Sequence, residues 1–263
     1  MTLRDELASI VSVTGVAHVE FREQIASTND LALEQCCSKD LPTPLLVLTD
    51  RQTAGRGRGK NQWQASPGAL TFSLVVDPQQ LQLDSENWPL ISLSAGVAVC
   101  EVLERLAQSN AFHLKWPNDI FVNDGKISGI LVEVSPSLGR RVVVGIGINV
   151  NNSFQHADGE QSFPAISLAD VTQRQWEIRD VLTEVTRSVL AKLTDLVEGK
   201  GEIVAAMNQR CYLNGREVVI ALGKNQIRGS CLGIDPQGAL LVSTQAGTRR
   251  VYGGVVQSFS PNR

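Results

Sequence analysis

A loop rich in glycine and arginine, residues 52–63 (QTAGRGRGKNQW), separates two apolar runs at residues 45–49 and 70–76. The apolar runs are typical of β-strands, so the loop is expected to join two strands. Glycine lets the backbone turn tightly and approach a ligand closely, and Arg56 and Arg58 give the loop two guanidinium groups that can face the same anion. We therefore expect a loop that closes over a carboxylate or a phosphate.

The glycine spacing excludes the two common nucleotide-binding motifs. A Walker A loop has four residues between its glycines and a serine or threonine after its lysine. Here three residues separate Gly55 from Gly59, and Asn61 follows the lysine. The later Gly-Ile-Gly segment that begins at Gly145 lacks the third glycine of a dinucleotide fingerprint, because position 150 is valine.

The periodicity of the apolar residues predicts an α+β chain. A helix is expected to begin near residue 29, and residues 88–108 and 178–197 have the spacing of long helices with one face in the core. Turn sequences such as Asn-Asp-Gly separate four shorter apolar runs, which predict hairpins rather than βαβ units. These runs are residues 112–116, 120–122, 127–134 and 142–150. We expect a mixed, largely antiparallel sheet with flanking helices.

The C-terminal part has a different pattern. Five short apolar runs are separated by glycine- and asparagine-containing turns, at residues 218–220, 227–234, 240–242, 249–252 and 255–259. This spacing fits a small β-barrel of SH3-like size. We expect a domain boundary near residue 212, which divides the chain into residues 1–211 and residues 212–263.

Charge and composition narrow the functional classes. The formal net charge is −3, which argues against a protein that binds DNA by neutralising phosphates. The five cysteines lack the CxxC spacing of a zinc or redox site, as expected for reduced thiols. The first residues are acidic where a signal peptide would be basic, and no apolar run is long enough to span a membrane. We expect a cytoplasmic protein with neither DNA nor a membrane as partner.

Three further segments follow the loop in a fixed order. They are Lys115-Trp-Pro-Asn-Asp119, Gly125-Lys-Ile-Ser-Gly-Ile-Leu-Val-Glu133 and Gly145-Ile-Gly-Ile-Asn-Val-Asn151. Together with the loop, this set resembles the biotin protein ligase family, also called biotin–[acetyl-CoA-carboxylase] ligase or holocarboxylase synthetase. The resemblance covers roughly residues 20–259 and is most specific between residues 27 and 151. A bifunctional ligase and repressor would need a helix-turn-helix domain ahead of Ser27, and only 26 residues precede it. The chain therefore resembles the monofunctional type without an N-terminal DNA-binding domain.

The resemblance implies a fold and an activity. Residues 1–211 would form the biotin- and ATP-binding catalytic domain that resembles class II synthetases, and residues 212–263 the SH3-like domain. The enzyme would activate biotin with MgATP as biotinyl-5′-AMP and transfer it to a lysine of a biotin carboxyl carrier protein of acetyl-CoA carboxylase. A lipoate or octanoate ligase or transferase of the same fold is the alternative. The protein would act as a monomer or a weak homodimer.

The resemblance also implies roles for individual residues. Lys126 and Arg58 would be catalytic, and Asp119 would hold Mg²⁺. Biotin would be bound by Ser27, Thr28, Asn29, Gln52, Arg56, Gly57, Arg58 and Lys126. ATP or the adenylate would be bound by Arg58, Trp63, Lys115, Asn118, Asp119, Lys126 and Asn149.

Structural alternatives stay open for several of these residues, and the segment from Lys115 to Asp119 would also be explained as a strand end followed by a turn. Ser27 would also be explained as a helix cap, Lys126 as a solvent-facing strand lysine, and Asn149 as a buried side chain with satisfied hydrogen bonds. The loop itself departs from the family pattern Arg-x-Gly-Arg-x-Trp after Arg58, where this chain has Gly-Lys-Asn-Gln before Trp63. The spacing from Arg58 to the tryptophan is kept.

Charge is unevenly distributed along the chain. Residues 211–263 contain six basic and two acidic side chains, a net charge of +4, which leaves −7 for the rest. Carrier domains in the family are typically acidic, so the resemblance suggests that this basic end docks the carrier. A solvated basic surface is the alternative.

Overall fold

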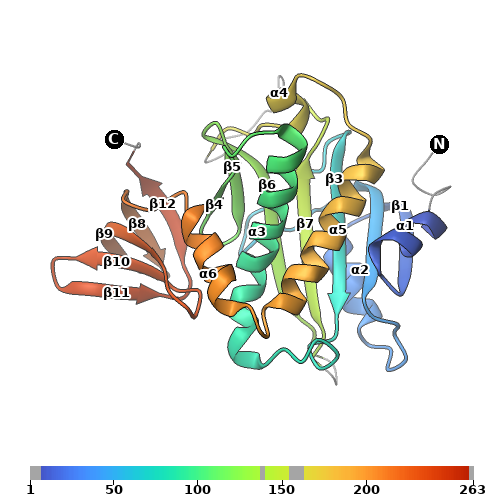
Figure 1. Ribbon diagram of the computed structural model, residues 1–263, viewed down its shortest axis with the longest axis horizontal. Coiled ribbons are helices and arrows are strands. Elements are labelled where there is room, and N and C mark those ends of the chain that lie inside the picture. The colour runs from blue at the N-terminus through green and yellow to red at the C-terminus, as the bar shows by residue number, and fades with distance from the viewer. Residues whose placement is uncertain (1–6, 137–139, 154–162, 261–263) are drawn as a thin grey trace.

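The computed structural model describes residues 7–136, 140–153 and 163–260 (Figure 1). A seven-stranded sheet forms the centre of the larger part of the molecule. Its order is β1-β2-β3-β7-β6-β5-β4, in which β1 and β2 are parallel and the other neighbours are antiparallel. The strands are β1 (His18–Ile25), β2 (Leu45–Gln52), β3 (Ala69–Val76), β4 (His113–Lys115), β5 (Asp119–Val122), β6 (Gly125–Val134) and β7 (Val142–Asn149). The expected mixed, largely antiparallel sheet is confirmed.

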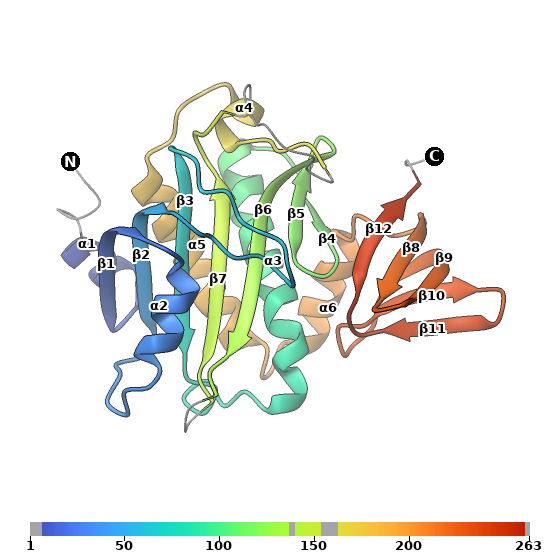
Figure 2. The same ribbon diagram turned by 180° about the vertical axis from the view of Figure 1, so that it is seen from behind.

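Helices cover both faces of this sheet (Figures 1 and 2). One face carries α3 (Trp88–Ala107) and α5 (Ile178–Asp195), which pack against each other, and the opposite face carries α2 (Thr28–Gln35). The remaining helices are α1 (Leu7–Thr14), the 3₁₀ turn η2 (Ser85–Asn87), α4 (Leu168–Thr172) and α6 (Lys200–Gln209). None of the helices in the described part of the chain is long and apolar enough to cross a membrane.

The β2 strand shows why both faces are covered. Alternate side chains of a strand point to opposite faces of its sheet. Leu46 and Leu48 belong to the large core under α3 and α5, whereas Leu45 and Val47 pack with Ala32 of α2. A strand that is apolar on both faces therefore needs helices on both sides, and the apolar run of residues 45–48 reflects this.

The connection between β2 and β3 has no helix or strand of its own. It crosses in front of β3, β7 and β6 on the face of the sheet that carries α2 (Figure 2). This connection contains the glycine-rich loop, so the loop lies over the middle of the sheet. The fold thereby places the loop opposite the later sequence motifs on β6 and β7.

The C-terminal strands form a second, five-stranded antiparallel sheet with the order β11-β10-β9-β8-β12. They are β8 (Glu217–Leu222), β9 (Asn225–Ile234), β10 (Leu240–Thr244), β11 (Gly247–Val251) and β12 (Val255–Phe259). This agrees with the expected SH3-like domain. Tyr212 donates its backbone N–H to Leu114 of β4, and its ring contacts Phe259 of β12. A boundary at this residue stays a prediction.

Candidate active site

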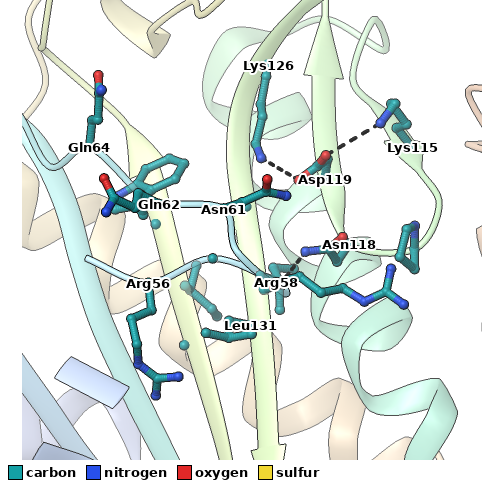
Figure 3. Close-up of a pocket in the computed structure, with 18 of the residues that line it drawn as sticks. Arg56, Arg58, Asn61, Gln62, Gln64, Lys115, Asn118, Asp119, Lys126 and Leu131 are labelled. Carbon is teal, nitrogen blue, oxygen red and sulfur yellow. Dashed lines mark hydrogen bonds and ion pairs between the residues drawn. The ribbon is translucent and has the colours of Figure 1, made fainter. Parts of the chain in front are cut away.

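A cavity of about 720 Å³ lies between the glycine-rich loop and the sheet. Its walls come from the start of α2, the end of β2, the loop, the turn between β4 and β5, the middle of β6 and β7, and residues 254–257 at the start of β12. Figure 3 shows Arg58 and Asn61 of the loop on the side of the cavity where Lys126, Asp119 and Asn118 lie. All the residues that the sequence singled out line the cavity: Ser27, Thr28, Asn29, Gln52, Arg56, Gly57, Arg58, Trp63, Lys115, Asn118, Asp119, Lys126 and Asn149.

Uncharged polar side chains form one end of the cavity. The Thr28 backbone N–H and hydroxyl both donate to Gln52 Oε1, at 2.7 and 3.0 Å. Ser73 Oγ lies 2.6 Å from Asn29 Oδ1 and 2.8 Å from Thr28 Oγ1. Ser27 occupies the N-cap position of α2, but its side chain makes no capping hydrogen bond. A cap role therefore does not account for this serine.

Two glycines of β7 leave room for side chains of the site. A Cβ atom at Gly145 would lie 2.0 Å from Asn29 Oδ1, and one at Gly147 would lie 2.3 Å from the Trp63 ring. Both distances are far below van der Waals contact. Asn29 and Trp63 can therefore pack here only because positions 145 and 147 are glycine. Comparison of this Gly-Ile-Gly segment with dinucleotide motifs alone did not predict this packing role.

A lysine–aspartate–lysine cluster forms the other end. Lys126 Nζ lies 2.5 Å from Asp119 Oδ1, and Lys115 Nζ lies 3.6 Å from Oδ2 (Figure 3). Lys126 points into the cavity toward Asp119, so it is not simply a solvent-facing lysine. Burial lowers the pKa of Lys115, Asp119 opposes this shift, and Lys126 adds to it. Two cations around one carboxylate leave this end suited to an anion.

The glycine-rich loop is folded as a short hairpin. Gly57 N donates to Asn61 O at 2.8 Å and Trp63 N donates to Gly55 O at 2.9 Å. Gly59 lies at the tip with a φ of +68°, a conformation that favours glycine. The departure from the family pattern at Gly59 therefore coincides with the turn of this hairpin.

The two arginines of the loop point to different partners. Arg58 Nη1 donates to the carbonyl of Gly254 at 2.6 Å, and burial lowers the pKa of its guanidinium. Arg56 pairs with Asp30 at 2.7 Å and with both oxygens of Glu133. In Figure 3 Arg56 points away from Arg58. The expectation that both guanidinium groups face one anion is therefore wrong, since Arg56 is paired with two carboxylates whereas Arg58 forms no ion pair with a described residue.

Asn118 and Asn149, the two asparagines of the later motifs, form hydrogen bonds with other residues of the protein. Asn118 Nδ2 donates to the carbonyl of Ile130 at 2.7 Å. Asn149 Nδ2 donates to the carbonyl of Lys126 at 3.3 Å, and its Oδ1 accepts from Asn152 at 3.0 Å. Asn149 thus matches the alternative of a buried, satisfied side chain, and its contact with a nucleotide stays a prediction.

Metal binding has one candidate ligand in the cavity. Asp119 is the only acidic side chain among the described lining residues, and the described residues contain no group of three metal-ligating side chains. Mg²⁺ bound to nucleotides commonly uses one or two carboxylates together with phosphate oxygens and water. Asp119 fits that donor set, although a metal at Oδ1 would compete with Lys126.

Several lining residues carried no signal in the sequence. Thr71 Oγ1 is buried without a hydrogen-bond partner among the described residues, as is Nε1 of Trp63, which the sequence had already singled out, so both donors are available to a ligand. Residues 254–257 come from the C-terminal part of the chain and face the loop only after folding. No local pattern distinguishes them from other strand residues.

Comparison with known proteins agrees with this site. A model described as "Biotin/lipoate A/B protein ligase family" matches residues 21–151, and one described as "Biotin protein ligase C terminal domain" matches residues 214–257. The bifunctional ligase/repressor BirA of Bacillus spizizenii is 30% identical over 244 residues, which span 91% of this chain and 74% of the relative. The chain belongs to the biotin protein ligase family.

Two further relatives match over more of their length. The biotin–[acetyl-CoA-carboxylase] ligase of Mycobacterium tuberculosis is 29% identical over 97% of this chain and 93% of the relative. The structure of the Aquifex aeolicus biotin protein ligase in complex with biotin and ATP superposes with a TM-score of 0.78 at 29% identity, covering 93% of this chain and 98% of that one. Both are named as biotin ligases, and neither match favours the lipoate alternative.

Proposed function

We propose that the protein is a biotin–protein ligase, which joins biotin and ATP into biotinyl-5′-AMP and transfers the biotinyl group to a lysine of a carrier protein. One observation carries the proposal: the cavity has an uncharged polar end at Thr28, Asn29 and Gln52 and a cationic end at Lys115 and Lys126. Biotin has the same division, with a neutral ureido ring at one end and a carboxylate at the other.

The first reaction joins two anions. A carboxylate oxygen of biotin attacks the α-phosphorus of ATP, the bond to the β-phosphate breaks, and pyrophosphate leaves. Charge builds on the α-phosphate as this happens, so fixed cations that meet it there lower the barrier. Lys126 of β6 and Arg58 of the loop both line the cavity and are placed for this role. Magnesium ion at Asp119 would neutralise further phosphate charge.

The second reaction needs an intermediate that survives until the carrier arrives. The ε-amine of the acceptor lysine attacks the acyl carbon of the mixed anhydride, the bond to the phosphate oxygen breaks, and AMP leaves. Water would compete with the amine, so the site must exclude it. Trp63 packs on Gly147 beneath the hairpin loop, and this arrangement supports a loop that covers the adenylate.

We infer that the carrier is the biotin carboxyl carrier protein of acetyl-CoA carboxylase, as the name of the Mycobacterium relative suggests. Residues 254–257 line the cavity, so the positively charged C-terminal part of the chain adjoins the place where the acceptor lysine must enter. This charge suits an acidic carrier domain. The division near residue 212, a cytoplasmic location and the absence of a DNA partner belong to the same proposal.

The first reaction gives a test without any carrier. The purified protein is mixed with ATP and Mg²⁺, and pyrophosphate release is followed with biotin, with lipoate or with neither. We expect one rapid burst of pyrophosphate with biotin, because the adenylate stays bound in the absence of an acceptor. A burst of the same size with lipoate would favour the alternative, and no burst with either acid would contradict ligase activity.

A further inference from the structure

Glu133, near the end of β6, receives hydrogen bonds from two different parts of the site. Arg56 Nη1 and Nη2 donate to its two carboxylate oxygens at 2.9 and 2.5 Å. Asn29 Nδ2 donates to Oε2 at 2.8 Å. Glu133 therefore connects the glycine-rich loop to the first turn of α2, although it does not itself line the cavity.

These bonds fix the orientation of the Asn29 amide. Its Nδ2 donates to Glu133 and also to the carbonyl of Leu131 at 3.2 Å, so both hydrogens of the amide are used. Its Oδ1 accepts from Ser73, and Gly145 leaves space next to that oxygen. A carbonyl oxygen has two lone pairs, so one acceptor position of Oδ1 stays available to an N–H group of a ligand.

The same carboxylate anchors the base of the loop. Arg56 follows Gly55, whose carbonyl accepts from Trp63, so the Arg56 side chain leaves the chain where the hairpin closes. Asp30 adds a second ion pair with Arg56 at 2.7 Å. Burial raises the pKa of Glu133, but the hydrogen bonds from Arg56 and Asn29 outweigh it and hold the pKa below its usual value. The anchor is therefore charged at neutral pH.

We propose that Glu133 is a positioning residue that couples closure of the glycine-rich loop to the orientation of Asn29. Arg56 holds the loop, and Asn29 Oδ1 is the acceptor offered to the ligand. Both side chains donate hydrogen bonds to the carboxylate of Glu133. A ligand that bonds to Asn29 Oδ1 therefore stabilises the arrangement that also keeps the loop closed. If that ligand is biotin, which rests on the proposed function, recognition of its ureido ring by Asn29 also helps to keep the loop closed over the adenylate.

The test compares two glutamates that each bind an arginine through both carboxylate oxygens. Glu133→Gln removes the charge at the anchor. Glu104→Gln is the matched control, because Glu104 on α3 accepts from Arg210 Nε and Nη2 at 3.1 and 2.8 Å and does not line the cavity. Both variants lose one partly buried ion pair, so a general loss of stability should affect them alike.

Hydrogen exchange of residues 55–63 is measured first, without biotin or ATP. We expect faster exchange of the Gly57 and Trp63 amides in Glu133→Gln than in the parent or in Glu104→Gln. Unchanged exchange in Glu133→Gln, or an equal increase in Glu104→Gln, would overturn the anchor. If Glu133→Gln does not fold, Arg56→Lys gives the same comparison, because it keeps the charge and loses the two-pronged contact.

Kinetics then test the coupling to Asn29. In Glu133→Gln we expect biotinyl-5′-AMP to dissociate about threefold to tenfold faster, and KM for biotin to rise by a similar factor while KM for ATP is unchanged. Equal rises in both KM values would mean that Glu133 has only a structural role. A parent protein that makes no adenylate would contradict the proposed function, whereas the exchange experiment would still decide whether the loop is anchored.

Discussion

The ammonium group of Lys126 lies 2.5 Å from the carboxylate of Asp119, across the hairpin of β5 and β6. This ion pair directs Lys126 into the cavity before any substrate is present. Lys126 must leave Asp119 to reach the carboxylate of a substrate, and Lys115, at 3.6 Å from the other oxygen, still balances the charge of Asp119 when it does. Lys126 is thus the cation that can move to the substrate, and Lys115 is the cation that remains beside Asp119.

The first prediction concerns Lys126. Lys126→Ala should abolish adenylate formation and leave the fold intact, because the side chain contributes charge and not core volume. Lys192→Ala is the control, since Lys192 forms a comparable ion pair with Glu101 outside the cavity, at 3.0 Å. Pyrophosphate release and thermal unfolding are measured for both variants. Biotin-dependent pyrophosphate release retained by Lys126→Ala would refute the role.

Arg58 is expected to retain the adenylate. Its guanidinium joins the loop to the carbonyl of Gly254, so Arg58→Gly removes both a cation and a link between the loop and the C-terminal strands. A lost charge-assisted contact costs about 1.5–3 kcal/mol, or roughly tenfold to a hundredfold in affinity. Biotinyl-5′-AMP should dissociate faster and label lysines of unrelated proteins. Arg228→Gly, on the exposed part of β9, is the control and should change neither the dissociation rate nor the labelling of unrelated proteins. Equal dissociation rates in the parent, Arg58→Gly and Arg228→Gly would mean that the loop is a passive turn.

Gly147 should not tolerate a methyl group. In Gly147→Ala the new Cβ would meet the Trp63 ring at 2.3 Å, which forces the ring and the loop above it to move. Overpacking of this kind typically costs about 1–3 kcal/mol of unfolding free energy. Gly201→Ala is the control, because its new Cβ would have no atom within 4 Å apart from its chain neighbours and the backbone of its own helix, and helical Gly→Ala changes gain about 0.5 kcal/mol. Urea unfolding of both variants measures the difference, and equal stabilities would contradict the packing of Trp63 on β7.

Acid should weaken the Glu133 anchor. The pKa of Glu133 is lowered in the folded protein by Arg56 and Asn29, against the effect of burial. Its stabilising contribution is therefore complete above the pKa of an unfolded glutamate and is lost as the pH falls through the lower folded value. The gap in unfolding free energy between the parent and Glu133→Gln should be widest near neutrality and close below about pH 4. A gap that is constant from neutral to acidic pH would show that Glu133 is not the titrating group.

The sequence predicted the elements with strong periodicity and missed those without it. The long helices α3 and α5 and the hairpins β4 to β7 lie where the apolar spacing placed them. The β1 strand was not predicted, because Glu20, Arg22 and Glu23 interrupt its apolar residues, and it gains order from its parallel pairing with β2. Such pairing is a long-range contact that no local pattern contains.

The same limit applies to the site. Lys126, Asp119 and the loop were found because each lies in a short recognisable motif. The partner of Arg56 was not found, because Glu133 is 77 residues away along the chain and meets it only across the folded sheet. Arg58 likewise meets Gly254 over a separation of 196 residues. Motifs thus predicted which residues gather at the cavity, and the fold decides which way their side chains point.

Transfer of biotin to a carrier tests the central claim most directly. The protein is incubated with ATP, Mg²⁺ and a biotin carrier domain, with either biotin or lipoate, and the intact mass of the carrier is measured. A carrier whose acceptor lysine is replaced by arginine is the control. The account predicts one biotinyl group on the native carrier, none on the control, and no addition from lipoate or without ATP. A carrier that stays unmodified with biotin and ATP, or that takes up lipoate as readily as biotin, would contradict it.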